Sequence, residues 1–500
     1  MGEDMLEVRR RKLEALRAAG VAAWPERYEK SHSTADARAL FERLEPSLAK
    51  TGDATAEAVA VAGRLVLFRP MGKLVFGQVQ DSRGRIQFAL RKDLLGEERF
   101  RLLLDNLDLG DHLGVRGPLF RTRTGEATVE AQEVVFLGKA LRPLPEKWHG
   151  LSDREACYRQ RYLDLLGNPG TLERFRLRSA FVRETRRHLE DHGFEEVDTP
   201  VLVAKPSGAL ARPFATHHRA LDLDVFLRIA PETYLKRLVV GGYERVYEFA
   251  RCFRNEGMDP SHLQDFTMLE WYAAWWNFED NMRYTESLLR EVLGRLFGAG
   301  PLEVRGRTID LSKEWPRVRL TDLIEKHTGI RVRNHASGAA LRDAIRTARI
   351  EIEDDGTMGW GGLVDALYKK ACRLHLDGPV FLVGHPIESS PLARRSDRDP
   401  GTADRYQLVV AGWEIVNAYS ELVDPVDQRE RLAEQAKAKA GGDEEALGMD
   451  EDYLLAMEHG MPPISGFGMG IDRVVALFTG VENLRDVVFF PLVRPLDGPG

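Results

Sequence analysis

Residues 246–257 read VYEFARCFRNEG, and residues 265–272 read DFTMLEWY. β-Branched and aromatic residues recur in both runs, and this composition predicts two strands. We expect the first strand to end at Arg254 and the second to return antiparallel to it. The polar residues 258–264 would form the loop between them. The chain from residue 157 onward mixes such strands with helical segments, which indicates an α+β domain.

Alternation along the two strands brings charged and aromatic side chains to one surface. Arg254 and Glu256 would share a face of the first strand. The second strand would place four side chains on one face: Phe266, Met268, Glu270 and Tyr272. Such a surface suits a nucleotide, because arginine pairs with a phosphate, a ring stacks on a base and a carboxylate accepts from an amino group. The alternative is a cross-strand ion pair on an ordinary sheet.

A glycine-rich run, GFGMGIDRVVALF, occupies residues 466–478 and predicts a strand that continues into a helix. It is similar to a dinucleotide-binding fingerprint, but only 28 residues (473–500) follow Asp472. That is too few for a βαβ unit of ~30 residues with its distant acid. The glycines would instead let a flat ligand lie against the strand, with Arg473 facing it from the helix start.

A third run, HGFEEVDTPVL, occupies residues 192–202. A helix is expected to end at Gly193, because glycine commonly follows the last turn of a helix. A strand that contains Pro200 would follow.

Composition limits the class of protein. A chain of 500 residues predicts two or three domains, and 43% hydrophobic with 30% charged residues is typical of a globular protein. No stretch approaches the ~20 apolar residues of a membrane span, and the charged N-terminus does not resemble a secretory signal. The three cysteines are widely separated, which argues against a disulfide framework or a zinc knuckle and for the cytoplasm. The net charge of -7 does not indicate a nucleic-acid binder, although a local basic face would suffice for one.

The first 57 residues predict a helical extension. A helix over residues 4–19 carries the basic run 9–12, which would be either solvated or a basic arm against a phosphate backbone. Residues 58–140 predict five short strands with a helix over about 92–106, after the third strand. This order is typical of a small Greek-key barrel of the OB type, which commonly binds single-stranded nucleic acid.

One face of this barrel would carry an aromatic side chain beside basic ones. Phe76, Gln87 and Arg69 are expected on it, with three further basic residues nearby: Arg64, Lys73 and Arg85. An aromatic ring among basic residues suits stacking on an unpaired base. The alternative is that Phe76 belongs to the barrel core.

The remaining boundaries follow from composition. Residues 141–156 predict a linker, and residues 157–500 one large domain. Residues 318–380 are rich in helical signals and predict a helical insertion, and residues 436–446 predict an exposed helix or loop.

The runs that contain His192, Arg254 and Arg473 resemble, in that order, the three signature motifs of class II aminoacyl-tRNA synthetases. With the barrel in front, the chain resembles the lysine–aspartate–asparagine subgroup. Six further stretches are similar to bacterial lysyl-tRNA synthetases: KALRPLP at 139–145, YRQRYLD at 158–164, ARPF at 211–214, LRIAPE at 227–232, YLKR at 234–237 and SPLARR at 390–395. The resemblance implies an antiparallel sheet of six to seven strands flanked by helices, and a homodimer formed through the first motif.

The acidic residues favour lysine over aspartate as the substrate. An ammonium group that leaves water needs charged acceptors, whereas an aspartate pocket would offer arginine or lysine. The acids in the matching segments are Glu232, Glu270, Glu414 and Glu421. Each acid alone is more often a solvated surface residue.

The resemblance assigns each of these pocket residues a role. Glu232 and the Gly208 backbone would hold the α-amino group, and Arg254 with Asn417 the carboxylate. Glu421, Glu270 and Tyr272 would take the ε-ammonium group, and Tyr419 would line the aliphatic stem.

The reaction that the resemblance implies has two steps. Lysine attacks the α-phosphate of ATP to give lysyl-adenylate, and the adenylate acylates the terminal ribose of tRNA(Lys). Arg254 would stabilise the α-phosphate, and Phe266 and Arg473 would sandwich the adenine. Glu256 would bind the adenine amino group, His262 would approach the outer phosphates, and Mg²⁺ would bridge phosphates and carboxylates. On the barrel, Arg69, Phe76, Gln87 and Glu133 would read the anticodon.

The chain departs from the family pattern around the metal. Gln407 stands where a first metal-proximal glutamate is expected, and Glu414 keeps the second. Trp413 precedes Glu414, and the loop reads HLQD at 262–265. Because an amide oxygen can still coordinate Mg²⁺ with less charge, we expect a rewired metal site formed by Gln407 and Glu414.

Three other functions remain open at this point. A paralogue could transfer lysine to a protein, although such proteins lack the barrel. An aspartyl- or asparaginyl-tRNA synthetase is disfavoured by the acidic pocket. A non-catalytic tRNA-binding protein would tolerate the loss of Arg254 or Arg473, and both are present.

Overall fold

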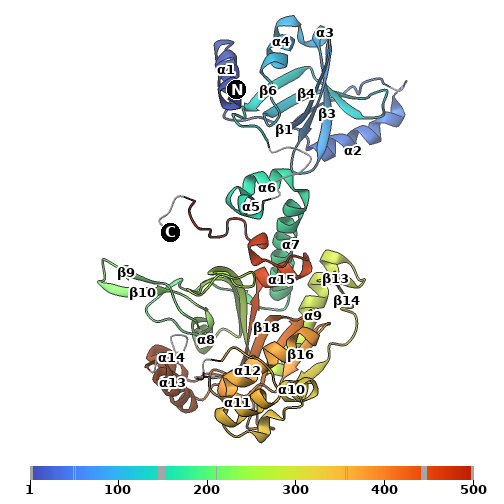
Figure 1. Cartoon of the computed structure of the whole chain (residues 1–500). Helices are drawn as coiled ribbons and strands as arrows, with labels where there is room; N and C mark the ends of the chain where they lie inside the picture. The colour runs from blue at the N-terminus through green and yellow to red at the C-terminus, as the bar shows by residue number, and fades with distance from the viewer. Residues whose placement is uncertain are drawn as a thin grey trace. The chain divides into compact units, whose positions relative to one another are not determined.

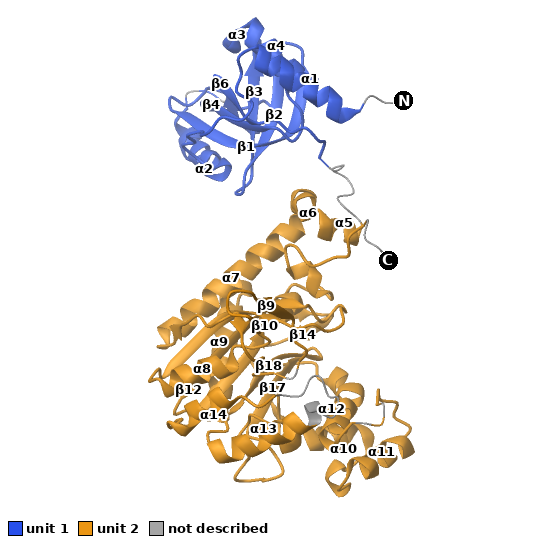
Figure 2. Ribbon diagram, turned by 90° about the vertical axis from the view of Figure 1, so that its left-hand side faces the viewer, with its two compact units in different colours: residues 1–152 blue, residues 153–500 orange. Residues whose placement is uncertain are grey.

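The computed structural model describes residues 4–48, 50, 52–144, 153–209, 211–354, 356, 358–440 and 448–496. The chain forms two compact units, residues 1–152 and 153–500 (Figure 2). Much of the linker expected over residues 141–156 lies outside the described residues. No helix among the described parts of the chain is long and apolar enough to cross a membrane.

Unit 1 is a closed β-barrel with helices around it (Figure 1). Its elements are α1 (Met5–Ala18), α2 (Thr34–Leu44), β1 (Ala58–Met71), β2 (Leu74–Gln80), β3 (Arg85–Arg91), α3 (Lys92–Leu95), α4 (Glu97–Asn106), β4 (His112–Arg121), β5 (Ala127–Glu130) and β6 (Glu133–Gly138). The strand order is β1-β2-β3-β5-β4-β6, and an additional β1–β4 pairing closes the barrel. Apolar side chains such as Val75, Val79 and Phe88 alternate into its core.

The barrel has six strands, so the prediction of five strands is wrong. The last predicted strand is interrupted at Ala131 and Gln132, whose amides bond to the Ala89 and Arg116 carbonyls of two different strands. As a result β5 pairs in parallel with β3, whereas β6 pairs only with β4. The helical segment after the third strand lies where the sequence predicts it, as α3 and α4.

The basic helix α1 packs on the barrel, which neither predicted alternative describes. The buried Arg9 donates to the carbonyls of Leu109, Ala140 and Arg142. Lys12 pairs with Asp108 at 2.8 Å. At least these two of the four basic side chains therefore hold the helix in place.

Unit 2 is built on one eight-stranded sheet in the order β15-β16-β17-β18-β19-β12-β11-β7. The strands are β15 (Arg317–Arg319), β16 (Val380–Val383), β17 (Arg405–Val410), β18 (Trp413–Ser420), β19 (Ile464–Gly470), β12 (Asp265–Ala274), β11 (Arg245–Phe253) and β7 (Glu195–Glu196). The six central strands are antiparallel, as the resemblance implies. The sheet has eight strands rather than six to seven, because β15 and β7 add parallel pairings at the two edges.

The two faces of the central strands have different partners. Alternate residues of β12, including Leu269 and Trp271, pack on one face against the helices α7 (Pro169–Asp191), α9 (Phe278–Phe297) and α15 (Ile471–Phe478). The residues between them, including Glu270 and Tyr272, face the opposite side, where α8 (Glu232–Val240) packs. The strand alternation therefore turns one side of the sheet to the layer of α7, α9 and α15, and turns Glu270 and Tyr272 to the side of α8.

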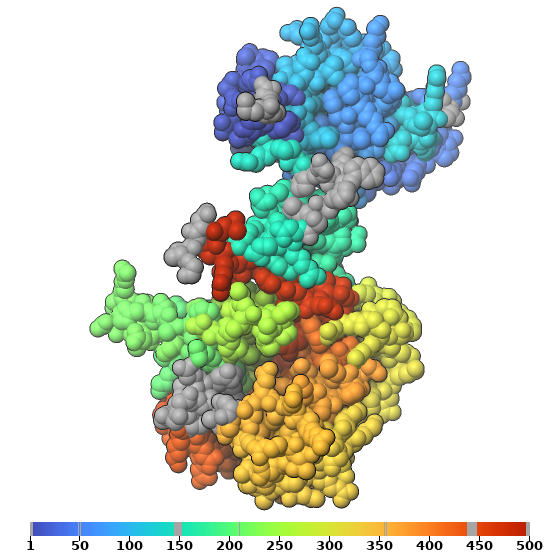
Figure 3. Space-filling view, in the orientation of Figure 1, coloured from blue at the N-terminus to red at the C-terminus, as the bar shows by residue number. Residues whose placement is uncertain are grey.

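The helical insertion lies in the chain between the edge strand β15 and its neighbour β16. It consists of α10 (Leu320–Thr328), α11 (Gly338–Thr347) and α12 (Trp360–Ala371), which share an apolar core. The smaller elements of unit 2 are α5 (Arg154–Arg159), α6 (Arg161–Gly167), β8 (Leu202–Val203), β9 (Ala215–His218), β10 (Leu223–Leu227), β13 (Leu302–Val304), β14 (Arg307–Ile309), α13 (Pro425–Ala440) and α14 (Glu451–Glu458). The β9–β10 hairpin projects from the body of the unit (Figure 3). Of the exposed segment predicted over 436–446, the described part belongs to α13.

Candidate active site

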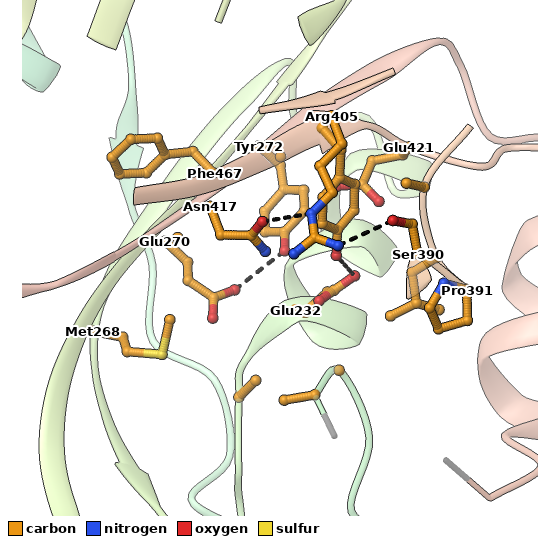
Figure 4. A pocket seen from close by; sticks show the side chains of 18 of the residues that line it. Glu232, Met268, Glu270, Tyr272, Ser390, Pro391, Arg405, Asn417, Glu421 and Phe467 are labelled. Atoms are coloured by element: carbon orange, nitrogen blue, oxygen red, sulfur yellow. Dashed lines mark hydrogen bonds between the residues drawn. The ribbon is translucent and has the colours of Figure 1, made fainter. Parts of the chain in front are cut away.

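A cavity of about 250 Å³ opens on the free face of the central strands (Figure 4). It is lined by all eight residues expected around lysine: Gly208, Glu232, Arg254, Glu270, Tyr272, Asn417, Tyr419 and Glu421. They come from α8, from the strands β12 and β18, and from the segments that follow β8, β11 and β18. The sheet therefore collects residues that are more than 200 positions apart in the chain.

The acids of this cavity are buried. Glu232, Glu270 and Glu421 are 5%, 4% and 2% exposed, which excludes the alternative of solvated surface residues. Burial, together with the charge of Glu232, raises the pKa of Glu270 to about 8. The Tyr419 hydroxyl donates to Glu232 at 2.8 Å, and the Tyr272 hydroxyl to Glu270 at 3.2 Å. The cavity thus concentrates acceptors for a cationic ligand.

Lys236 balances two of these acids, and sequence reasoning did not single it out. Its buried ammonium group donates to Glu232 at 2.5 Å and pairs with Glu421. Burial alone would lower the pKa of Lys236, but the Glu232 and Glu421 carboxylates raise it well above its usual value. The only signal in the sequence is that Lys236 follows Glu232 by four residues, one turn of a helix.

Two glycines make room for the acids. A Cβ atom at Gly466 would overlap the Glu421 carboxylate and the Tyr272 ring. A Cβ atom at Gly208, where φ is +88°, would lie 2.8 Å from the Glu232 Cβ. Glycine at position 466 therefore leaves space for the side chains of Glu421 and Tyr272, as well as for any ligand that lies against the strand.

A second cavity of about 240 Å³ adjoins the first. It is lined by the five residues expected around ATP, which are Arg254, Glu256, His262, Phe266 and Arg473, and by Glu414. The two cavities share Arg254, Met268, Asn417 and Gly468. A group that bridges them would therefore contact Arg254.

The two arginines of the second cavity, Arg254 and Arg473, contact an aromatic ring and a backbone carbonyl group, respectively. The Arg254 guanidinium lies 5.1 Å from the centre of the Phe266 ring. Arg473 donates to the Glu414 carbonyl at 2.9 Å, and burial lowers its pKa in spite of the nearby Glu414 charge. Strand alternation does not place Glu256 beside Arg254, because β11 ends at Phe253 and both residues belong to the following loop.

His262 is held by its own loop. Its Nδ1 atom lies 2.7 Å from an Asp259 carboxylate oxygen, and Ser261 donates to the other oxygen of the same carboxylate. Partial burial alone would raise the pKa of Asp259, but the hydrogen bonds from Ser261 and His262 outweigh it and lower the pKa. The imidazole is therefore oriented before any phosphate binds.

The two residues expected at the metal lie on neighbouring strands. Gln407 lies directly opposite Asn417, and Glu414 opposite Val409. Gln407 is buried, and its Oε1 atom has no hydrogen-bond partner among the described residues. The described residues contain no cluster of three or more histidine, cysteine or acidic side chains that could hold a metal by themselves. Glu414 and an amide oxygen would suit an ion held mainly by phosphates.

On the barrel, three of the four residues expected to read the anticodon lie on adjacent strands. Arg69 is directly opposite Phe76, and Gln87 donates to Thr128 at 2.9 Å on the same outer face. Phe76 is partly exposed and lines a shallow cavity with Lys73 and Phe120, so it does not belong to the core.

The fourth of these residues, Glu133, lies on β6 opposite Arg116. Two of the basic residues named beside Phe76 are engaged locally. Arg64 donates to the Gly110 carbonyl, and Arg85 to Gln80.

Comparison with known proteins matches both units to families. Residues 153–494 match the tRNA synthetases class II (D, K and N), and residues 59–137 match the OB-fold nucleic acid binding domain. A lysine–tRNA ligase of Latilactobacillus sakei is 43% identical over 492 residues, which cover 98% of this chain and 96% of the relative. A lysine–tRNA ligase of Pelotomaculum thermopropionicum is 44% identical over 492 residues, covering 98% and 95%. One from Aquifex aeolicus is 46% identical over 441 residues, covering 87% and 73%.

Proposed function

The chain belongs to the class II tRNA synthetases of the D, K and N group, and we propose that it is an ATP-dependent lysine–tRNA ligase. It activates L-lysine to lysyl-adenylate with release of pyrophosphate, and it transfers the lysyl group to the 3′ end of tRNA(Lys) with release of AMP. The observation that carries the proposal is the pair of adjoining cavities. One holds three buried glutamates, the other is lined by Phe266 and Arg473, and Arg254 belongs to both.

The glutamates select a diamino acid. Glu232 and the Gly208 backbone receive the α-amino group, and Glu270, Glu421 and Tyr272 receive the ε-ammonium group. An ammonium group loses strong hydration on entry, and buried carboxylates replace it. Aspartate or asparagine would bring no ε-ammonium group to Glu270 and Glu421, which argues against the corresponding synthetases.

The lysine carboxylate is placed at the junction of the cavities. Arg254 and Asn417 line both cavities and hold the carboxylate against the α-phosphate of ATP. A carboxylate oxygen attacks the α-phosphorus, the bond to the bridging oxygen breaks, and pyrophosphate leaves. The guanidinium of Arg254 neutralises charge that develops on the α-phosphate, so positioning and electrostatics account for most of the rate.

The second cavity receives the nucleotide. Phe266 and Arg473 enclose the adenine, Glu256 accepts from its amino group, and His262 approaches the outer phosphates. A Mg²⁺ ion bound with ATP would neutralise phosphate charge, with Glu414 and Gln407 as its protein ligands. The unpartnered Gln407 Oε1 atom supports this assignment.

The tRNA binds at both units. Residues 58–140 form the anticodon-binding barrel, on which Arg69, Phe76, Gln87 and Glu133 contact the anticodon. Residues 1–57 form its helical extension, residues 141–156 the linker, and residues 157–500 the catalytic domain with an insertion at about 318–380. The match of residues 59–137 to a nucleic-acid-binding family argues against a protein substrate for the lysyl group. A homodimer formed through the segment around His192 completes the proposal.

The test is lysine-dependent exchange of pyrophosphate into ATP, followed by aminoacylation of total tRNA with a panel of amino acids. Lysine alone should support both reactions. Glu421→Gln should lower kcat/KM for lysine at least about 100-fold, since it removes one buried charge partner of the ammonium group. Glu451→Gln, at an exposed glutamate of α14, is the matched control. Exchange driven by another amino acid, or none with lysine, would refute the proposal.

A further inference from the structure

Asn417 can serve a ligand in two opposite ways. Its side-chain amide presents a carbonyl oxygen that accepts and an NH₂ group that donates. In a cavity that must hold both ammonium groups and a carboxylate, the end that faces the ligand decides which group Asn417 binds. No part of the Asn417 side chain itself settles that choice.

Arg405 settles it. The Arg405 Nε donates to the Asn417 Oδ1 at 2.8 Å, across the paired strands β17 and β18 (Figure 4). A guanidinium group has only donors, so it can hold only the carbonyl end of the amide. The NH₂ end is left for the cavity that Asn417 lines.

Arg405 is itself oriented from a second side. Its Nη1 atom donates to the Ser389 carbonyl and to the Ser390 hydroxyl, both at 3.0 Å. Ser389, Ser390 and Arg405 all line the cavity. Three hydrogen bonds in two directions fix a planar guanidinium better than they would fix a flexible ammonium group.

The positive charge of Arg405 also divides the cavity. With Arg254 and the Asn417 NH₂ group it forms a donor region, whereas Glu270 and Glu421 form an acceptor region. We propose that Arg405 is a positioning residue that locks the Asn417 amide with its NH₂ group toward the carboxylate of the amino acid. This inference rests on the proposed lysine–tRNA ligase function.

The test compares L-lysine with L-lysinamide, which keeps both ammonium groups but lacks the carboxylate. In Arg405→Gln the KM for lysine in pyrophosphate exchange should rise about tenfold or more, while the inhibition constant of lysinamide changes less than about threefold. The KM for ATP should stay within about twofold. A general distortion of the cavity would instead weaken lysine and lysinamide alike.

Arg431→Gln is the matched control. Arg431 donates to the Ala393 carbonyl at 2.9 Å and so holds the segment next to Ser390, but it makes no hydrogen bond to Asn417. In this variant the KM for lysine and the inhibition constant of lysinamide should change by the same factor, if they change at all. Asn417→Ala should raise the KM for lysine selectively, as Arg405→Gln does. The double variant should have the same KM for lysine as Asn417→Ala alone, because both substitutions remove the same interaction with the carboxylate.

The outcomes are distinct. The role of Arg405 is overturned by any of three results. The KM for lysine and the inhibition constant of lysinamide rise by the same factor, the KM for lysine does not rise, or the effects of the two substitutions add in the double variant. If Arg405→Gln does not fold, Arg405→Lys is judged by the same comparison, since a lysine keeps the charge but not the planar fork. A wild-type protein without lysine-dependent exchange would instead overturn the proposed function itself.

Discussion

At the scale of single residues, the site depends on charges that are balanced inside the protein. Lys236 pairs with Glu232 and Glu421, whereas Glu270 has only the Tyr272 hydroxyl as a hydrogen-bond donor among the described residues. Burial raises the pKa of Glu421 well above its usual value, although the Lys236 ammonium group opposes this shift. A carboxyl group with a pKa of about 8 is mostly protonated at neutral pH. Glu270 is therefore a neutral acid in the free protein and a potential carboxylate in the presence of an ammonium ligand.

This balance predicts that lysine binding releases a proton. An ammonium group favours the charged form of Glu270, so the pKa of Glu270 falls on binding. Below pH 8 the proton must be displaced, and the dissociation constant of lysine should rise by roughly tenfold from pH 8.5 to pH 7. Calorimetry at pH 7 in buffers of different ionisation enthalpy should show release of close to one proton, and much less at pH 9.

Glu270→Gln is the control for that measurement, because glutamine has no proton to lose. The variant should bind lysine more weakly and with a smaller dependence on the buffer, since Glu421 is then the remaining buried acid with a raised pKa near the ammonium group. A wild-type binding enthalpy that is the same in all buffers at pH 7 would contradict the role of Glu270.

At the scale of elements, the β17–β18 hairpin joins the two cavities. Its paired residues present Arg405 and Tyr419 to the first cavity, proposed for lysine, and Glu414 to the second, proposed for ATP, with Gln407 and Asn417 paired between them. Because paired residues of antiparallel strands share a face, a substitution at position 407 acts beside Asn417. The proposed Mg²⁺ ligands Gln407 and Glu414 thus both belong to this hairpin.

Gln407→Glu should lower the Mg²⁺ concentration needed for half-maximal pyrophosphate exchange several-fold, because it adds a second carboxylate. Without Mg²⁺ the same variant should melt at a lower temperature than the wild type, since a buried charge then has no partner. Titration of Mg²⁺ at fixed ATP, together with thermal unfolding, measures both effects.

Gln428→Glu is matched to this variant, because Gln428 is also buried with an unpartnered Oε1 atom but lies on α13, outside both cavities. It should lower the melting temperature and leave the Mg²⁺ requirement unchanged. If Gln407→Glu behaves like Gln428→Glu, Gln407 is not a metal ligand.

At the scale of the whole molecule, amino acid activation and tRNA recognition are divided between two units. Both cavities are lined only by residues of unit 2, and the exposed face of Phe76 belongs to unit 1. Each unit has its own apolar core. The two activities should therefore be separable by substitution.

Phe76→Ala should raise the KM for tRNA in aminoacylation about tenfold or more, since loss of base stacking costs roughly 1–3 kcal/mol per base. Lysine-dependent pyrophosphate exchange, which needs no tRNA, should be unchanged. Leu94→Ala, at an exposed apolar residue of α3 that does not line the cavity beside Phe76, should affect neither assay. If Phe76→Ala also lowered the rate of pyrophosphate exchange, the assignment of the two activities to separate units would be contradicted.

Local patterns in the sequence predict much of this molecule. The hairpin over 246–272, the strand and helix over 466–478 and the helix after the third barrel strand are all present, because side-chain periodicity and glycine positions are properties of neighbouring residues. The class II fold and the barrel are confirmed by the family matches. The split of the last barrel strand escaped prediction, because it depends on which two strands receive the amides of Ala131 and Gln132.

The runs that contain His192, Arg254 and Arg473, together with the barrel and six further stretches, were sufficient to predict, by resemblance, an ATP-dependent synthetase with an acidic pocket. Only the tertiary structure decided how that pocket is balanced. Lys236 and Arg405 reach the acids and Asn417 through a helical turn and a strand register, and their effect depends on burial. Distance and exclusion of water set the strength of these charges, and both arise only when segments far apart in the chain pack together.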